Sequence, residues 1–314
     1  MTINTYINQF KKLKLNKLNG RVRPHKICML LAVLDLAKSG GLERNKIYLN
    51  PELIERYKAF FNASSASGEL ANPHYPFFYL RGNLSDGSKS FWNVVSLQGR
   101  EEFLEKLQVR KLSDVTENIE FAFLDSALFE LIQNLNNISI FEDALSRFWF
   151  DRGHTDLQAI IKASSAISSY ERQIRRGLIV EKSLTEVDSI RSPAFRRVVT
   201  QIYDYRCAAS GARILLPSGE AMVEAAHLNP FSESGDDDPR NGLALTPNLH
   251  WAMDKHLIAP GPDLRWHVSK MLDRRISEFQ IFTKYDGEPL LKPVESRFMP
   301  KEESLHWRLE RLRC

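Results

Sequence analysis

The stretch Glu224-Ala-Ala-His-Leu-Asn-Pro230, followed by Asn241 and by His250-Trp-Ala-Met-Asp254, decides how the whole chain is interpreted. His227, Asn241 and His250 stand 14 and then 9 residues apart. A neutral imidazole can take a proton from water, and an amide can hold that imidazole in one orientation without titrating. A histidine and an aspartate four residues apart share one helix face and can bind one metal ion. The pattern therefore indicates metal-assisted hydrolysis of a phosphodiester.

The residues around this pattern predict two strands, a loop and a helix. Residues 213–216 and 222–227 are strand candidates on either side of the turn at Pro217-Ser218-Gly219. The acidic run Asp236 to Asp238 is interpreted as a solvated loop and a helix-start signal rather than a metal cluster. Pro247 then begins the helix that carries His250 and Asp254. Before the strands, Ser192-Pro193 predicts a helix that runs to about Tyr203.

These segments resemble the HNH endonuclease family over roughly residues 192–270. The matching segments are Ala-Ala-His-Leu-Asn-Pro, Pro-Arg-Asn-Gly-Leu-Ala-Leu and Leu-His-Trp-Ala-Met-Asp. The resemblance implies a ββα-metal unit, in which two strands and a helix surround one metal ion. It implies that His227 is the general base, that Asn241 fixes the imidazole of that base and that His250 is a metal ligand. Asp254 stands where many relatives have a second ligand histidine.

The chain departs from the family at Ala226, where many relatives have a ligating aspartate or histidine. Glu224 is the candidate replacement, and water is the alternative. A carboxylate and an imidazole suit Mg²⁺ or Mn²⁺, although other first-row metals remain open. Simpler interpretations of the same residues are a structural histidine at His227 and a solvated helix carboxylate at Asp254. Cys207 lacks a paired cysteine, so no structural zinc is expected.

The first half of the chain is predicted to be mostly helical. Pro24 begins a long apolar helix that ends at Gly40-Gly41. Two aromatic, β-prone runs, His74–Arg81 and Ser90–Val95, flank Asp86-Gly87 and predict a hairpin. Residues 101–176 are expected to be helical for the most part.

The length of 314 residues favours two domains. We place a DNA-recognition domain at 1–176, a linker at 177–191, where periodicity is weak and charge is mixed, and the nuclease domain with a C-terminal extension at 192–314. The fold class expected is α+β, with a mostly helical N-terminal domain that includes a small hairpin.

Two short motifs in the first half, Arg23-Pro-His-Lys26 and Asn72-Pro-His-Tyr-Pro-Phe77, resemble the sulfur-binding domain of phosphorothioate-dependent type IV restriction endonucleases. In that family a Pro-His-Lys segment opens a long apolar helix, and a Tyr-Pro-Phe segment follows some 45–50 residues later. Both are present here in the same order and spacing. The resemblance covers about half of the chain and implies that this half reads phosphorothioated DNA.

A phosphorothioate carries a non-bridging sulfur that is larger, more polarisable and less well hydrated than oxygen. A shallow apolar cup made by Tyr75 and Pro76 could prefer that sulfur. Arg23, His25 and Lys26 would hold the phosphate oxygens and nearby base edges, and Arg81 is a further phosphate candidate. The alternatives are that Pro76 shapes an edge strand, that His25 belongs to a helix cap and that the neighbouring Phe77 and Phe78 are core residues.

The bulk composition fits a globular protein of this kind without identifying it. Net charge is only +4, but residues 1–34 contain no acidic side chain, which indicates either a polyanion-binding face or a solvated one. Three scattered cysteines exclude a disulfide framework and favour a reducing cytoplasm, and no signal peptide is visible. The longest apolar run is too short to span a bilayer, so no membrane partner is expected.

Taken with both resemblances, the sequence predicts a modification-dependent restriction endonuclease that acts on double-stranded DNA in the cytoplasm. Cutting both strands would suggest a homodimer. Two alternatives stay open, namely an HNH nuclease that reads another modification or unmodified sequence, and an inactive DNA-binding regulator with a nuclease fold.

Overall fold

The computed structural model describes residues 1–314 except 19, 67, 151–155, 179–187 and 217–218. The described residues form two compact units, Met1–Ser169 and Tyr170–Cys314. The predicted linker at 177–191 falls largely on residues 179–187, which lie outside the described part of the chain. Within that part, no helix has both the length and the apolar character needed to cross a bilayer.

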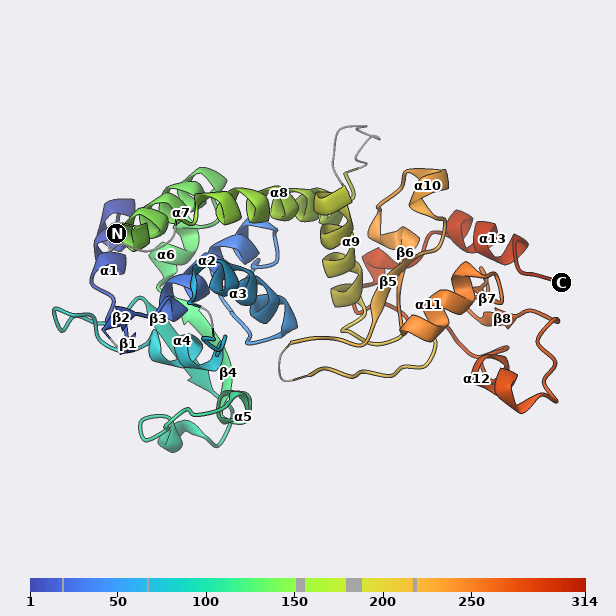
Figure 1. Cartoon of the computed structure of the whole chain (residues 1–314), viewed down its shortest axis with the longest axis horizontal. Helices are drawn as coiled ribbons and strands as arrows, with labels where there is room; N and C mark the ends of the chain where they lie inside the picture. Colours follow the sequence, from blue (N-terminus) through green and yellow to red (C-terminus); the bar gives the residue numbers. More distant parts are fainter. Residues whose placement is uncertain (19, 67, 151–155, 179–187, 217–218) are drawn as a thin grey trace. The chain divides into compact units, whose positions relative to one another are not determined.

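The first unit combines helices with short antiparallel strand pairs (Figure 1). In chain order its elements are α1 (Ile3–Lys11), β1 (Lys17–Leu18), β2 (Arg21–Val22), α2 (His25–Lys38), α3 (Pro51–Ser64), α4 (His74–Tyr79), β3 (Trp92–Ser96), η1 (Glu101–Phe103), α5 (Leu112–Thr116), β4 (Ile119–Leu124), α6 (Ser126–Leu131) and α7 (Leu135–Phe150). Helix α8 (Gln158–Arg175) contains the boundary between the two units.

Helix α2 is the centre of the first unit. Pro24 is its N-cap residue, and every side chain from Ile27 to Lys38 is buried. The helix packs against α3, α4 and α7. Charges inside this core are paired, since the Arg56 guanidinium donates to Asp35 and Glu52. The prediction of a buried helix that starts at Pro24 is thus confirmed.

The predicted hairpin at His74–Arg81 and Ser90–Val95 is wrong. The first run is helix α4, and the second is β3, whose antiparallel partner is β4. Two prolines explain the helix, because Pro73 and Pro76 fix backbone angles suited to a first helical turn. The same element places Phe77 and Phe78 in the core, as expected, and excludes an edge-strand role for Pro76.

The second unit holds short paired strands between helices. Its elements after α8 are α9 (Asp188–Ile202), β5 (Glu224–His227), α10 (Phe231–Ser234), η2 (Pro239–Asn241), β6 (Gly242–Leu245), α11 (Pro247–Asp254), β7 (Ile258–Pro260), β8 (Trp266–Val268), η3 (Ser277–Phe279), α12 (Gln280–Thr283), η4 (Ser296–Phe298) and α13 (Glu302–Glu310). Strand β5 pairs with β6, and β7 pairs with β8, both antiparallel.

The order of elements in this unit differs from the prediction. The partner of β5 is β6, which follows the loop, and not residues 213–216, which form only an isolated bridge between Leu215 and Ala221. The reason is burial. Residues Gly242–Leu245 are all buried, whereas Ile214 and Leu216 are half exposed and have no sheet face to cover. The order is therefore strand, loop, strand and helix.

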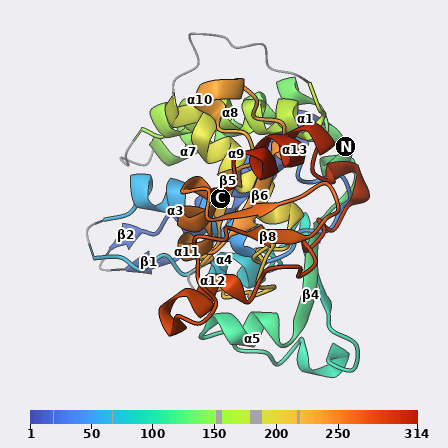
Figure 2. The ribbon, with the colours of Figure 1, turned by 90° about the vertical axis from the view of Figure 1, so that its right-hand side faces the viewer.

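Helix α9 begins at Asp188, four residues before the predicted start, so that Pro193 lies inside the helix. It packs against both β5 and β6, as Figure 2 shows from a second direction. This packing brings α9 next to the end of β5, where His227 stands.

Candidate functional site

The β5–β6 pair and helix α11 position the predicted nuclease residues. His227 is the last residue of β5 and pairs in register with Gly242, the first residue of β6. Pro247 occupies the first turn of α11, which carries His250 and Asp254 one helical turn apart. The helix contacts β5, the strand that also bears Glu224.

The three residues predicted as metal ligands meet at the side chain of His250. Its Nδ1 lies 2.9 Å from Glu224 Oε2, and its Nε2 lies 3.4 Å from Asp254 Oδ2. Both carboxylates are about half exposed. Across the described residues, no three His, Cys, Asp or Glu side chains already surround a common point as metal ligands would. The chemistry of the set, two carboxylates and one imidazole, nevertheless suits a divalent ion.

The imidazole of His227 is fixed on its edge and on its face. Its Nε2 lies 2.9 Å from Asp237 Oδ1. The Phe195 ring, from α9, stacks on it with the centroids 3.9 Å apart and the planes inclined by 3°. The His227 side chain remains 21% exposed.

Asp237 is the functional candidate that the sequence reasoning missed. The expectation of a solvated acidic loop is wrong for this residue, which is 5% exposed, although Asp238 does cap the helix η2. Arg191 Nη1 donates to both oxygens of Asp237, at 2.8 and 2.9 Å, and the Tyr170 hydroxyl donates to Oδ2 at 2.9 Å. No sequence signal separates Asp237 from its two acidic neighbours.

Asn241 is fully buried and closes the loop between β5 and β6. Its Nδ2 donates to the carbonyls of Asn229 and Asp236, and its Oδ1 accepts from the Asn229 N–H. The amide thus holds the loop backbone, and the loop carries Asp237 to the ring of His227. In this arrangement the hydrogen bond to the ring that the resemblance implied for Asn241 is made by Asp237.

Gly242 allows the close approach of α9 to the strand pair. A Cβ atom at this position would meet Phe195 Cζ and Val199 Cγ2 at 2.7 Å each. A larger residue would therefore push away the ring that stacks on His227. The glycine thus permits the packing of α9 against the strand pair.

Arg308, from α13, ties the two halves of the site together. Its buried guanidinium donates to the carbonyls of His227 at 2.8 Å, Leu228 at 2.6 Å and Met253 at 3.1 Å. Burial lowers the pKa of Arg308 to about 10, which still leaves it charged at neutral pH. The end of β5 and the end of α11 are thus held by one side chain.

We expect Arg308→Ala to lower the free energy of unfolding by about 3 kcal/mol, because buried carbonyls lose their donor and a cavity remains. Denaturant unfolding of the whole protein measures this change. Arg311→Ala is the matched control, since Arg311 is exposed at the end of the same helix and should change stability by less than about 0.5 kcal/mol. Equal stability of the two variants would contradict the assignment.

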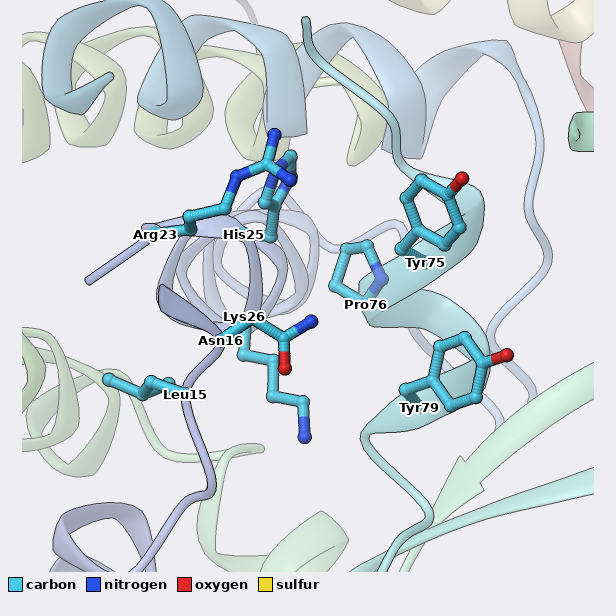
Figure 3. Close-up of a pocket in the computed structure, with 8 residues that line it drawn as sticks. All are labelled: Leu15, Asn16, Arg23, His25, Lys26, Tyr75, Pro76 and Tyr79. Carbon is cyan, nitrogen blue, oxygen red and sulfur yellow. The ribbon is translucent and has the colours of Figure 1, made fainter. Parts of the chain in front are cut away.

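In the first unit, five of the six predicted DNA-reading residues line one pocket (Figure 3). The pocket has a volume of about 170 Å³. Its lining consists of Leu15, Asn16, Arg23, His25, Lys26, Tyr75, Pro76 and Tyr79. The sixth residue, Arg81, lies outside this lining, where its guanidinium stacks on Phe78 and donates to the Leu104 carbonyl at 2.9 Å.

The basic side chains of this pocket are partly desolvated. Burial, with help from Arg23 and His74, lowers the pKa of His25 to about 4, so its imidazole is neutral at pH 7. Burial and Lys14 lower the pKa of Lys26 to about 8, so its positive charge is lost as pH rises through that value. The pocket is therefore most cationic below pH 8.

Two buried nitrogen atoms of this pocket, on His25 and Arg23, lack a hydrogen-bond partner within the described residues. His25 Nδ1 contacts the Tyr57 hydroxyl at 2.6 Å, which argues against a capping role for His25. Within the described residues, neither His25 Nε2 nor Arg23 Nε has a hydrogen-bond partner. Buried donors without acceptors are costly, and an anion seated in the pocket would satisfy them.

Comparison with protein-family models agrees with the C-terminal site. A family model described as "HNH endonuclease" matches residues 200–259, which include both site histidines, Glu224, Asn241 and Asp254. A solved structure of a "Modification dependent TagI restriction endonuclease" is similar at 22% identity and a TM-score of 0.31, over 39% of this chain and 39% of that chain. No curated protein matches. The second unit thus contains an HNH endonuclease domain.

Proposed function

We propose that this protein is a divalent-metal-dependent DNA endonuclease that binds phosphorothioated duplex DNA and cuts phosphodiester bonds nearby, in restriction or defence. The observation that carries the proposal is the meeting of Glu224, His250 and Asp254 next to the strand that bears His227, inside the range that matches the HNH endonuclease family. The arrangement offers a base and a cation site on one small scaffold.

His227 is the general base of this proposal. Its Nε2 faces Asp237, so Nδ1 is the nitrogen left to accept a proton from water. As that proton moves to Nδ1, the water oxygen bonds to phosphorus and the bond from phosphorus to the 3′ oxygen breaks. The electron pair of that bond stays on the 3′ oxygen, which then takes a proton from solvent.

His250, Asp254 and Glu224 are the residues that would hold the metal. A bound Mg²⁺ or Mn²⁺ would stabilise the negative charge that develops on the phosphate and on the leaving oxygen. The fit rests on the chemistry of the donors and on their placement on adjoining elements, β5 and α11. His250 Nε2 lies 3.4 Å from Asp254 Oδ2, a distance that suits two ligands of one ion, whereas Glu224 contacts the opposite nitrogen, Nδ1, and would have to turn to reach that ion.

The pocket of the first unit is the proposed reader of the modification. Arg23, His25 and Lys26 would bind phosphate oxygens, and the positive N-terminal end of α2 favours an anion at the same place. Pro76 and Tyr75 provide the apolar wall on which the less hydrated sulfur would rest. In Figure 3 the Pro76 ring faces the space that Lys26 and Asn16 border from the other side.

The described residues of one chain hold one such proposed nuclease site. Cutting both strands at one locus would therefore need two chains, and we propose a homodimer on that ground alone.

The function is tested with matched duplexes that do or do not carry one phosphorothioate, incubated with the protein and Mg²⁺, Mn²⁺ or a chelator. We expect tighter binding to the sulfur-bearing duplex, cleavage near it with a divalent ion, and no cleavage with the chelator. Equal cleavage of both duplexes would favour a reader of another feature. Binding without cleavage under every metal condition would favour the DNA-binding regulator.

A further inference from the structure

Asp237 stands outside the three residues that define the resemblance, yet it makes the closest polar contact to the ring of His227. The carboxylate is 3% exposed, and its Oδ1 lies 2.9 Å from Nε2 of the imidazole. It reaches this place because the loop between β5 and β6 is tied back by the Asn241 amide. A buried carboxylate against an imidazole is an arrangement that fixes both the tautomer and the orientation of the ring.

The carboxylate of Asp237 is itself held on both oxygens. Arg191, from α9, donates to Oδ1 and Oδ2, and Tyr170, from α8, donates to Oδ2. The guanidinium of Arg191 also stacks on Phe231 at 3.5 Å and pairs with Asp188. A buried carboxylate held by a guanidinium and two further partners cannot turn away from His227.

Among the described residues, Nδ1 of the His227 imidazole has no hydrogen-bond partner. Phe195 covers one face of the ring, and Asp237 binds Nε2, so the lone pair of Nδ1 is the available base. The charged and titratable groups that face this pair are Arg191, Tyr170 and, on the backbone carbonyl of His227, Arg308. When His227 takes a proton, its new positive charge meets the negative charge of Asp237.

We propose that Asp237 is a positioning residue that holds His227 with Nδ1 towards the water and stabilises the imidazolium formed during cleavage. Arg191 and Tyr170 hold Asp237 in turn. The inference rests on the proposed endonuclease function and names a residue that acts through the base rather than on the DNA. Asn241 then serves the same end indirectly, by fixing the loop.

The test measures DNA cleavage by Asp237→Asn over a range of pH with a divalent metal present. We expect kcat to fall by about tenfold to a hundredfold with KM for DNA unchanged, because only the step that charges His227 is affected. The acid limb of the pH–rate profile should move to lower pH, since the negative charge that favours the imidazolium is gone. Asp238→Asn is the matched control. Its carboxylate pairs with Arg240 and Lys301, and asparagine can keep its cap on η2.

A second variant pair separates positioning from a general structural role. In a His227→Ala background, Asp237→Asn should cause no further loss, because its effect passes through the missing ring. Tyr170→Phe, which removes one hydrogen bond to Asp237, should lower kcat several-fold, and it is the variant to use if Asp237→Asn does not fold.

Three results would overturn the inference, namely an unmoved acid limb, an unchanged kcat, or an equal loss with and without His227. A wild-type protein that cuts no DNA would instead overturn the proposed function itself.

Discussion

Replacing His227 with alanine is expected to slow DNA cleavage about a hundredfold or more, with DNA binding retained. The variant loses the imidazole that contacts Asp237 and that supplies the proposed general base. General bases contribute roughly a hundredfold to ten-thousandfold to a rate. The reader pocket lies in the other unit and keeps its residues, so affinity for DNA should change little. Single-turnover cleavage measures the loss, and a binding titration checks the retained affinity.

His306→Ala is the matched control for that measurement. His306 is exposed on α13 and lies 3.6 Å from Glu302, away from the ring of His227. The control should cleave at the wild-type rate. A His227→Ala protein that nicked DNA as fast as the control, with Mg²⁺ or Mn²⁺, would refute the assignment of the base.

The second large effect is expected at the apolar wall of the reader pocket. Tyr75→Ala and Pro76→Ala should each reduce the preference for sulfur-bearing over ordinary duplex about tenfold, which corresponds to about 1.4 kcal/mol. The physical reason is that the polarisable sulfur loses its contact surface while the cationic side chains still bind the phosphate. Competition binding with matched duplexes measures the ratio of the two affinities.

Pro76→Ala is the cleaner of the two variants. Pro76 is the third residue of α4, where a backbone N–H has no partner within the helix, so alanine should leave the fold intact. Tyr48→Ala serves as control, because Tyr48 is 45% exposed and lies outside the pocket lining. An unchanged preference in both wall variants would show that sulfur is not read there.

Much of the nuclease site could be anticipated from spacing. An i, i+4 pair on a helix predicted that His250 and Asp254 lie on one face, and the structure also brings Glu224 to the same imidazole. Asp237 could not be anticipated, because its burial depends on Arg191 and Tyr170, which are distant in the sequence. A contact made by a loop that folds back onto a strand does not produce the helical or strand periodicity by which buried residues are recognised in a sequence.

The strand partners were harder to predict than the helices. Helix α2 was predictable because a proline precedes its first turn and a nearly continuous apolar run follows. The aromatic run at His74–Tyr79 has strand propensity, but two prolines and burial on one side make it a helix. Likewise β5 found its partner across a loop rather than across the nearest turn, since only Gly242–Leu245 had a buried place to occupy. Tertiary burial decided both outcomes.

Five of the six residues predicted to read DNA line one pocket, and Arg81 lies outside that lining. No pattern in the sequence distinguishes an arginine that stacks on a neighbouring phenylalanine from one that faces a phosphate.

The single guanidinium of Arg308 sets a practical limit on transplanting this nuclease. The family match ends at residue 259, yet α13 supplies the donor that locks the carbonyls flanking His227, and α9 supplies Phe195 from before the match begins. A transferred segment limited to residues 200–259 would lack both Phe195 and Arg308. Hybrid enzymes built from this scaffold should take the segment from Tyr170 to Cys314 as one indivisible cassette.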